Sequence, residues 1–172
     1  MKRNTQFVAR MGILFAVAIT LSYIESLMPT VVPIAPGIKL GLSNVVTMFC
    51  FQLMQVKAAF VLAVLKAGFA FLTRGATAGL LSLAGGLLSV TVLALVFQTS
   101  MSDGMRSVAG AVAHNLGQLC LECALMKSFV VLHFLPALLL GGILMGILNA
   151  VLVRRLQPVL NRVLFAQNSQ KG

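Results

Sequence analysis

Four titratable side chains interrupt the long apolar stretches of this sequence: Glu25, Lys66, His114 and Glu122. A titratable group within a membrane-crossing helix costs free energy, and such groups usually face a cavity, a polar partner or a solute pathway. The chemistry that they suggest is therefore polar binding inside a membrane, either of one another or of a solute. These residues are the first candidates for function.

Polar residues around His114 and Glu122 are spaced as one face of a helix. Asn115, Gln118 and Glu122 stand three and four residues apart, and His114 lies at the edge of the same face. A polar row on an otherwise apolar helix is costly unless other polar groups meet it. The row is therefore expected to point into the interior of a helical bundle.

Two interpretations of this polar row remain open. The polar groups can satisfy one another, for instance through a pair of Lys66 with Glu122, and so fasten the bundle together. Alternatively, they line a pocket that opens outward and captures a solute, with Lys39 and Arg74 at the outer ends of neighbouring helices. In that case the nearby charges are positive in sum, which would tolerate an acidic or phosphorylated solute.

The cysteines and histidines do not predict a metal site. Cys120 and Cys123 form a C-x-x-C pair, but the pair lies within an apolar stretch and the sequence has no second one. His114 and His133 fall on different predicted helices, at different depths, so they are not expected to complete a zinc site. A buried cysteine behaves as a small apolar residue. We expect no metal and no other cofactor.

The composition indicates which elements hold these residues. Apolar residues make up 59% of the 172 residues and charged residues 9%, so most of the chain must face lipid or other apolar helices. Because a membrane-crossing helix needs about 20 apolar residues, the sequence predicts an all-α polytopic membrane protein, a bundle of six transmembrane helices in a single domain. The second and third spans are short and are separated by a break at residues 55–57. The domain covers residues 1–172, with spans at residues 8–28, 40–53, 58–72, 78–97, 107–126 and 129–153 and a basic tail at residues 154–172.

Basic residues at the ends of the spans predict the orientation, because cytoplasmic flanks are enriched in Lys and Arg. Of the 13 Lys and Arg residues, nine flank the spans on the side of the two termini, three lie on the other side, and Lys66 lies within a span. Both termini are therefore expected in the cytoplasm, with the protein in the cell membrane. The nine are Lys2, Arg3, Arg10, Lys57, Arg106, Arg154, Arg155, Arg162 and Lys171, and the three are Lys39, Arg74 and Lys127.

Two other readings of the basic residues do not fit. The apolar run after the basic start is too long for a typical signal peptide, and no A-x-A-like cleavage site follows it, so we expect a retained first span. The excess of basic residues follows from membrane topology and is not interleaved with aromatic residues, so no nucleic-acid partner is expected. The expected surroundings of the chain are membrane lipid.

Small residues on the first predicted span indicate a second functional surface. Gly12 and Ala16 are four residues apart, which places both on one face of the helix in its cytoplasmic half. Gly142 and Gly146 in the last predicted span have the same spacing. Such a pair allows another helix to approach closely. For Gly12 and Ala16, internal packing and docking of a partner subunit both remain open.

Three longer segments resemble a known family. They run from Pro36 to Asn44 (PGIKLGLSN), from Leu83 to Ser89 (LAGGLLS) and from Ala109 to Gln118 (AGAVAHNLGQ). In this order they resemble the Gx transporter family, also known as heptaprenyl diphosphate synthase component I, and the resemblance covers roughly residues 9–155. That family is similar to the substrate-binding S components of energy-coupling factor transporters, which have a six-helix fold.

The resemblance implies a role and partners. An S component binds a small solute toward the outside and docks onto a transmembrane T component driven by two ATPases. Its docking motif, Ala-x-x-x-Ala on the first helix, falls on Gly12 and Ala16 here, with glycine in place of the first alanine. The solute would lie between the later helices, capped by the loop at residues 29–39. The candidate solute-binding residues are Lys39, Asn44, Lys66, His114, Asn115, Gln118 and Glu122.

Three functions remain open, and in none of them is this chain an enzyme. The first is a substrate-binding subunit for solute uptake, energised by partner T-component and ATPase subunits, because the sequence has no G-x-x-x-x-G-K-[ST] phosphate loop. The second is a non-catalytic membrane component of a heptaprenyl diphosphate synthase. Catalysis of prenyl transfer would need Mg²⁺ held by clustered carboxylates, and the chain has three acids, Glu25, Asp103 and Glu122. A purely structural membrane protein is the third, and transport is the function we expect.

Overall fold

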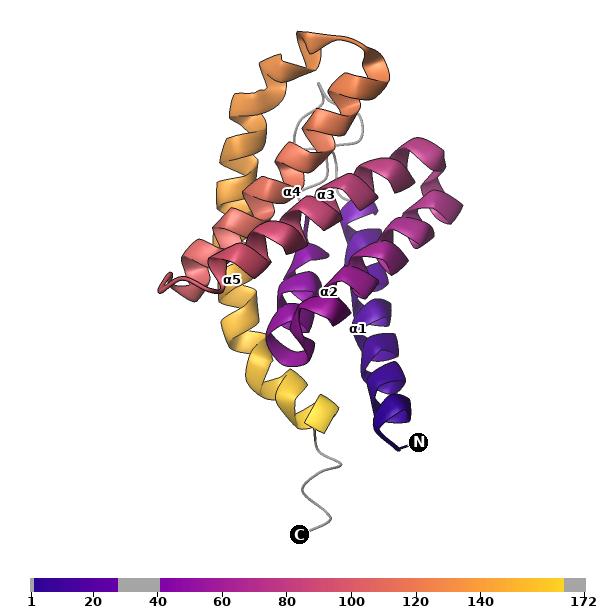
Figure 1. The fold of residues 1–172 in the computed structure, drawn as a ribbon, viewed down its shortest axis with the longest axis vertical. Coiled ribbons are helices and arrows are strands. Elements are labelled where there is room, and N and C mark those ends of the chain that lie inside the picture. The colour runs from indigo at the N-terminus through magenta and orange to yellow at the C-terminus, as the bar shows by residue number, and fades with distance from the viewer. Residues whose placement is uncertain (1, 28–40, 166–172) are drawn as a thin grey trace.

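The computed structural model describes residues 2–27 and 41–165 (Figure 1). The described residues form helices and no strand, which confirms the predicted all-α class. The loop expected to cap the site, residues 29–39, and the basic residue Lys39 within it lie outside the described residues. The elements are α1 (Lys2–Leu27), α2 (Asn44–Arg74), α3 (Ala76–Val96), α4 (Asp103–Met126), the short 3-10 helix η1 (Phe129–Phe134) and α5 (Leu135–Phe165).

The prediction of six separate helices is not supported, because a single element, α2, covers the second and third predicted spans as two helical halves joined at Gln55. Both of these spans, residues 40–53 and 58–72, fall largely within α2. Within this helix Gln55 has a non-helical backbone, with φ of 73° and ψ of 173°. The helix resumes at the next residue, so the break expected at residues 55–57 is a kink of one residue. A left-handed φ is unfavourable for a residue with a Cβ, so the packing around Gln55 must stabilise it.

The count of six membrane spans is likewise not supported by the described residues. Four of the described helices are long and apolar enough to cross a membrane, judged by length and composition. The long α-helix without such a stretch is α4, because Asp103, Arg106 and the polar row around Gln118 lower its hydropathy. The four stretches are Thr5–Glu25, Asn44–Arg74, Ala76–Val96 and Phe129–Val159.

The helices pack mainly against their neighbours in the chain. Helix α2 packs against α3, α3 against α4, and α4 against α5, while α1 lies against α2. Buried Leu14 and Ala18 of α1 contact the cluster around Leu62 of α2, and Ala63 of α2 belongs to a cluster with Val90 of α3. Figure 1 shows the first turn of α1 and the last turns of α5 at the same end of the molecule.

Glycines set the close contact between α3 and α4. A Cβ on Gly117 of α4 would lie 2.7 Å from the carbonyl oxygen of Ala84, and a Cβ on Gly85 of α3 would lie 2.8 Å from the carbonyl oxygen of His114. One helical turn further along, the Ser89 hydroxyl donates a hydrogen bond of 2.8 Å to the carbonyl oxygen of Gly110. The segments 83–89 and 109–118 therefore pack directly against each other, backbone to backbone.

The small residues of the last predicted span are internal. A Cβ on Gly142 of α5 would lie 3.1 Å from a side-chain atom of Val112, and a Cβ on Gly146 would collide with the backbone of Val108. These two glycines allow α5 to lie close to α4. They are used for packing within the chain.

Candidate functional site

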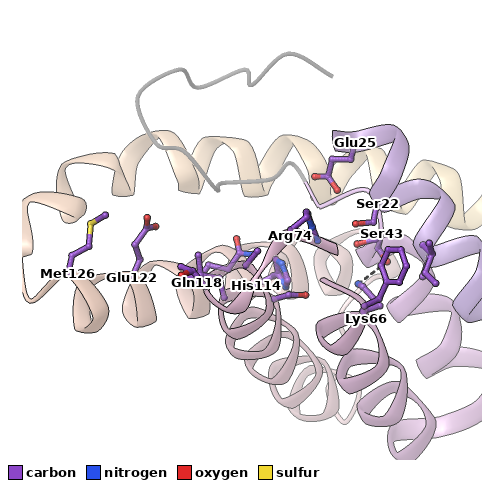
Figure 2. Close-up of a pocket in the computed structure, with 16 residues that line it drawn as sticks. Ser22, Glu25, Ser43, Lys66, Arg74, His114, Gln118, Glu122 and Met126 are labelled. Atoms are coloured by element: carbon purple, nitrogen blue, oxygen red, sulfur yellow. Dashed lines mark hydrogen bonds between the residues drawn. The ribbon is translucent and has the colours of Figure 1, made fainter. Parts of the chain in front are cut away.

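A cavity of about 360 Å³ lies between α1, α2, α3 and α4, near the start of α2 and the later turns of α4 (Figure 2). Its volume is at the lower end of the range of roughly 300 to 1,000 Å³ that is typical of small-molecule sites. The polar lining residues are Ser22, Glu25, Ser43, Lys66, Arg74, Thr77, Ser82, His114, Gln118 and Glu122, and the apolar ones are Ala18, Ile19, Phe69, Ala78, Leu81 and Met126.

Helix α4 contributes one continuous row of side chains to this cavity. The row consists of His114, Gln118, Glu122 and Met126, which are four residues apart and so lie above one another on the helix surface. Figure 2 shows Glu122 and Met126 toward one end of the cavity, with Gln118 and His114 following along it. The sequence placed His114 at the edge of the polar face, whereas in the structure it belongs to the row that lines the cavity.

Asn115 does not belong to this row. Its side-chain Nδ2 donates a hydrogen bond of 2.9 Å to the carbonyl oxygen of Leu138, at the buried contact of α4 with α5. Successive residues of a helix are about 100° apart, so Asn115 points away from the direction of His114. The expectation that Asn115 shares a site face with Gln118 and Glu122 is therefore not met in the structure.

Two buried polar atoms in the row have no hydrogen-bond partner among the described residues. They are His114 Nδ1 and Gln118 Oε1. Both side chains are more than nine-tenths buried. A buried polar atom without a partner costs about 1 to 3 kcal/mol. Both residues line the cavity, but these two atoms are themselves buried, so a molecule in the cavity would reach them only after a small movement of the side chains.

Lys66 is bonded to the start of its own helix. Its Nζ donates to the carbonyl oxygen of Ser43 at 3.1 Å, to Asn44 Oδ1 at 3.2 Å and to Thr47 Oγ1 at 3.1 Å. An ammonium group has three donors, so these three oxygens account for all of them. The suggested pair of Lys66 with Glu122 is absent from the described residues. Lys66 therefore ties the two halves of α2 together across the kink at Gln55.

Asn44 lies behind this lysine and not on the cavity wall. It lines a separate void of about 10 Å³ together with Ser89, Ser107 and Asn149. A void of that size holds about one water molecule. Asn149 Oδ1 is buried there without a partner among the described residues. Asn44 is linked to the cavity through its hydrogen bond to Lys66.

Glu25 holds the chain where it enters α2. Its carboxylate accepts a hydrogen bond from the backbone N–H of Gly41, and its side chain is buried. Gly41 has φ of 84°, in the left-handed region that favours glycine. The negative charge of Glu25 also attracts Lys66 and Arg74. Glu25 therefore couples the end of α1 to the start of α2 at one end of the cavity.

The charges that line the cavity are balanced. Lys66 and Arg74 are the cations, and Glu25 and Glu122 are the carboxylates. Lys127, which the sequence placed nearby, is not among the lining residues. The excess of positive charge that we expected is therefore not found among the described lining residues. Ser22, Ser43, Thr77 and Ser82 also line the cavity, and the sequence analysis missed them because single serines and threonines are common in helices.

The face of α1 with Gly12 and Ala16 is unoccupied by other described elements. Both residues are exposed, and a Cβ on Gly12 would meet no heavy atom within 4 Å. The buried residues Met11, Leu14 and Ala18 lie on another side of the helix, against α2. Internal packing, which explains Gly142 and Gly146, thus does not explain Gly12 and Ala16 within the described part of the chain.

Comparison with known proteins places these features in one family. The family model described as heptaprenyl diphosphate synthase component I matches residues 14–156, which include the cavity lining from Ala18 to Met126 and the contact of α3 with α4. No curated protein and no solved structure matches the chain. The match covers most of the chain, and the chain therefore belongs to the heptaprenyl diphosphate synthase component I family, also called the Gx transporter family.

Proposed function

We propose that this chain is the solute-binding membrane subunit of an uptake system, and that the cavity between α1 and α4 is its solute site. The observation that carries the proposal is a cavity of about 360 Å³ whose lining residues include His114 and Gln118, each of which has a buried polar atom without a partner among the described residues. A purely structural polar network would satisfy such atoms within the protein. A polar solute supplies the missing partners.

The direction of uptake follows from the proposed orientation. Ser43 and Arg74, at the two ends of α2, line the same cavity, so the chain turns back at Gln55. We propose that α4 also crosses the membrane. With both termini in the cytoplasm, the junction of α2 with α3 at Gly75 and the end of α4 at Met126 then lie on the outer side. Arg74, Thr77, Glu122 and Met126 line the cavity near these two points, so a solute enters it from outside. The basic residues at the ends of the chain support this orientation.

The energy for uptake must come from partners or from an ion gradient, because the chain has no phosphate-binding loop. We propose that the α1 face with Gly12 and Ala16 contacts a T component, to which two ATPases are attached. Small exposed residues four apart allow a partner helix to approach closely. Ala16→Trp should abolish co-purification with that subunit and leave the melting temperature of the isolated chain unchanged. A lowered melting temperature would make this face part of the internal packing.

The family name raises the alternative of a component of a prenyl diphosphate synthase. Asp103 opens α4 and pairs with Arg106 at 3.1 Å, while Glu122 lies near the other end of the same helix. Glu25 and Glu122 line one cavity, but no three acidic, histidine or cysteine side chains of the described residues gather as a metal site would require. We propose that any part of this chain in such an assembly is non-catalytic, and no observation of the structure favours this role over solute binding.

The proposal is tested by loading the purified protein. The chain, in detergent, is equilibrated with a small-molecule extract of the producing cells, washed, and unfolded to release what it holds. Mass spectrometry should find at least one small solute in stoichiometric amount. The same protein unfolded before loading is the control for adsorption to detergent. Release of no solute above that control would contradict the proposal.

A further inference from the structure

The charged groups of the cavity differ in whether they are free to bind a solute. Lys66 has its three donors on Ser43, Asn44 and Thr47, and Glu25 accepts from the backbone of Gly41. These two groups are occupied in holding the protein together. Arg74 and Glu122 line the same cavity and make no hydrogen bond or ion pair with another described residue, although the charge of Glu25 attracts Arg74 from nearby. They are the charged groups that remain available to a bound molecule.

The two available groups sit in regions of opposite charge. Arg74 shares its end of the cavity with Lys66 and Glu25, where two cations face one carboxylate. Glu122 lies at the other end beside Met126, with no cation among the lining residues shown near it (Figure 2). The cavity thus has one net positive end and one negative end. A purely anionic molecule would be repelled by Glu122, and a purely cationic molecule would be repelled by Arg74 and Lys66.

The unpaired polar atoms agree with this polarity. Gln118 Oε1 is an acceptor without a partner, and Gln118 lies one helical turn from Glu122 on the same row. A carbonyl oxygen and a carboxylate one turn apart are suited to a group with several N–H donors, such as an ammonium group. Phe69, Leu81 and Ile19 line the walls and offer apolar contact to the body of the molecule.

We infer that the cavity binds a small zwitterion whose charged groups lie at opposite ends, with its acidic group on Arg74 and its ammonium group on Glu122 and Gln118. This inference rests on the proposed solute-binding function. Figure 2 shows Glu122 toward the end of the cavity with Met126, whereas Arg74 is close enough to Glu25 for their charges to interact. A molecule with its ammonium and acidic groups at the two ends of an apolar chain, such as an ω-amino acid, fits this arrangement. An α-amino acid, whose two groups are adjacent, does not.

A series of α,ω-amino acids tests the inference. The probes are glycine, 4-aminobutyrate, 6-aminohexanoate and 8-aminooctanoate, each also as its N-acetyl derivative and its methyl ester. Binding to the full chain in detergent is measured by calorimetry and by the shift in melting temperature. We expect the longer zwitterions to bind, glycine not to bind, and both single-charge derivatives to bind at least about tenfold more weakly, because each loses one charge-assisted contact.

Two variants separate recognition of charge from damage to the fold. Glu122→Gln should weaken binding of the zwitterion at least about tenfold. It should leave the affinity for the N-acetyl derivative unchanged, because that derivative has no ammonium group. Arg74→Gln should weaken binding of the zwitterion and leave the affinity for the methyl ester unchanged, because the ester has no carboxylate. The inference would be overturned if each variant lost as much affinity for its matched single-charge derivative as for the zwitterion.

The inference and the proposed function fail in different ways. If no member of the series binds, but the protein retains a solute of a single charge from the cell extract, the zwitterion inference is wrong and solute binding stands. If neither the series nor the extract supplies a bound molecule, both are wrong. A retained solute with separated amino and acidic groups, whose affinity falls in Arg74→Gln and Glu122→Gln, would support both.

Discussion

Gly85 of α3 faces His114 of α4 so closely that no side chain fits between them. A Cβ at position 85 would lie 2.8 Å from the His114 carbonyl oxygen and 2.9 Å from its ring Cε1. The same Cβ would lie 2.9 Å from Cγ of Gln118. The close packing of the two helices therefore fixes the positions of two residues that line the cavity.

Gly85→Ala should accordingly damage both the fold and the site. The new methyl group forces α3 and α4 apart, and overpacking of this kind costs about 1 to 3 kcal/mol of unfolding free energy. Gly68→Ala in α2 is the matched control, because a Cβ there meets no heavy atom within 4 Å. We expect the control to be neutral or slightly stabilising, since alanine favours helix over glycine. Thermal unfolding of both variants measures this, and equal melting temperatures would show that the contact is not close.

Lys66→Met should lower stability, whether or not solute is present. The change leaves Asn44 Oδ1 and Thr47 Oγ1 without their charged donor, and hydrogen bonds to charged groups contribute about 1.5 to 3 kcal/mol each. Lys57→Met is the control, because Lys57 is exposed and surface changes usually stay within about 0.5 kcal/mol. If Lys66→Met lost solute affinity at an unchanged melting temperature, Lys66 would be a solute ligand instead.

Two exposed threonines on either side of α3 report the orientation. Thr73 lies near the end of α2 and Thr99 follows α3, which has 21 residues and is long enough to cross a membrane. In a background without native cysteines, a membrane-impermeant thiol reagent applied to intact cells should label Thr73→Cys and not Thr99→Cys. Labelling of Thr99→Cys alone would reverse the proposed orientation and turn the cavity toward the cytoplasm.

Patterns local to one helix could be predicted from the sequence. The apolar runs indicated helices, and the polar spacing on α4 indicated that Gln118 and Glu122 face the same way, as they do in the cavity lining. The interruption at residues 55–57 was also visible, although the chain resumes its helix after Gln55 alone and forms one element. The sequence thus located the interruption but did not show that the two halves would join at a single residue.

Contacts between helices could not be predicted in the same way. Nothing in the spacing showed that Lys66 would bond to Thr47 across the kink, or that Asn115 would turn toward Leu138. Both depend on how neighbouring helices approach, which is set by glycines such as Gly85 and Gly146. The spacing of small residues is the same around Gly12 and Gly146, but a Cβ on Gly146 would collide with Val108 whereas a Cβ on Gly12 would meet no described atom within 4 Å. Only the structure shows this difference.

The most direct test of the solute site compares two neighbouring polar residues of α4. Gln118 lines the cavity and its Oε1 has no partner among the described residues, whereas Asn115 is bonded to Leu138 outside the cavity. The affinity for the solute retained from cell extract and the melting temperature without solute are measured for Gln118→Leu and Asn115→Leu. Gln118→Leu should weaken binding at least about tenfold with little change in melting temperature, and Asn115→Leu should lower the melting temperature and keep the affinity. Unchanged affinity in Gln118→Leu, together with a lowered melting temperature, would contradict the solute site and make the row a structural network.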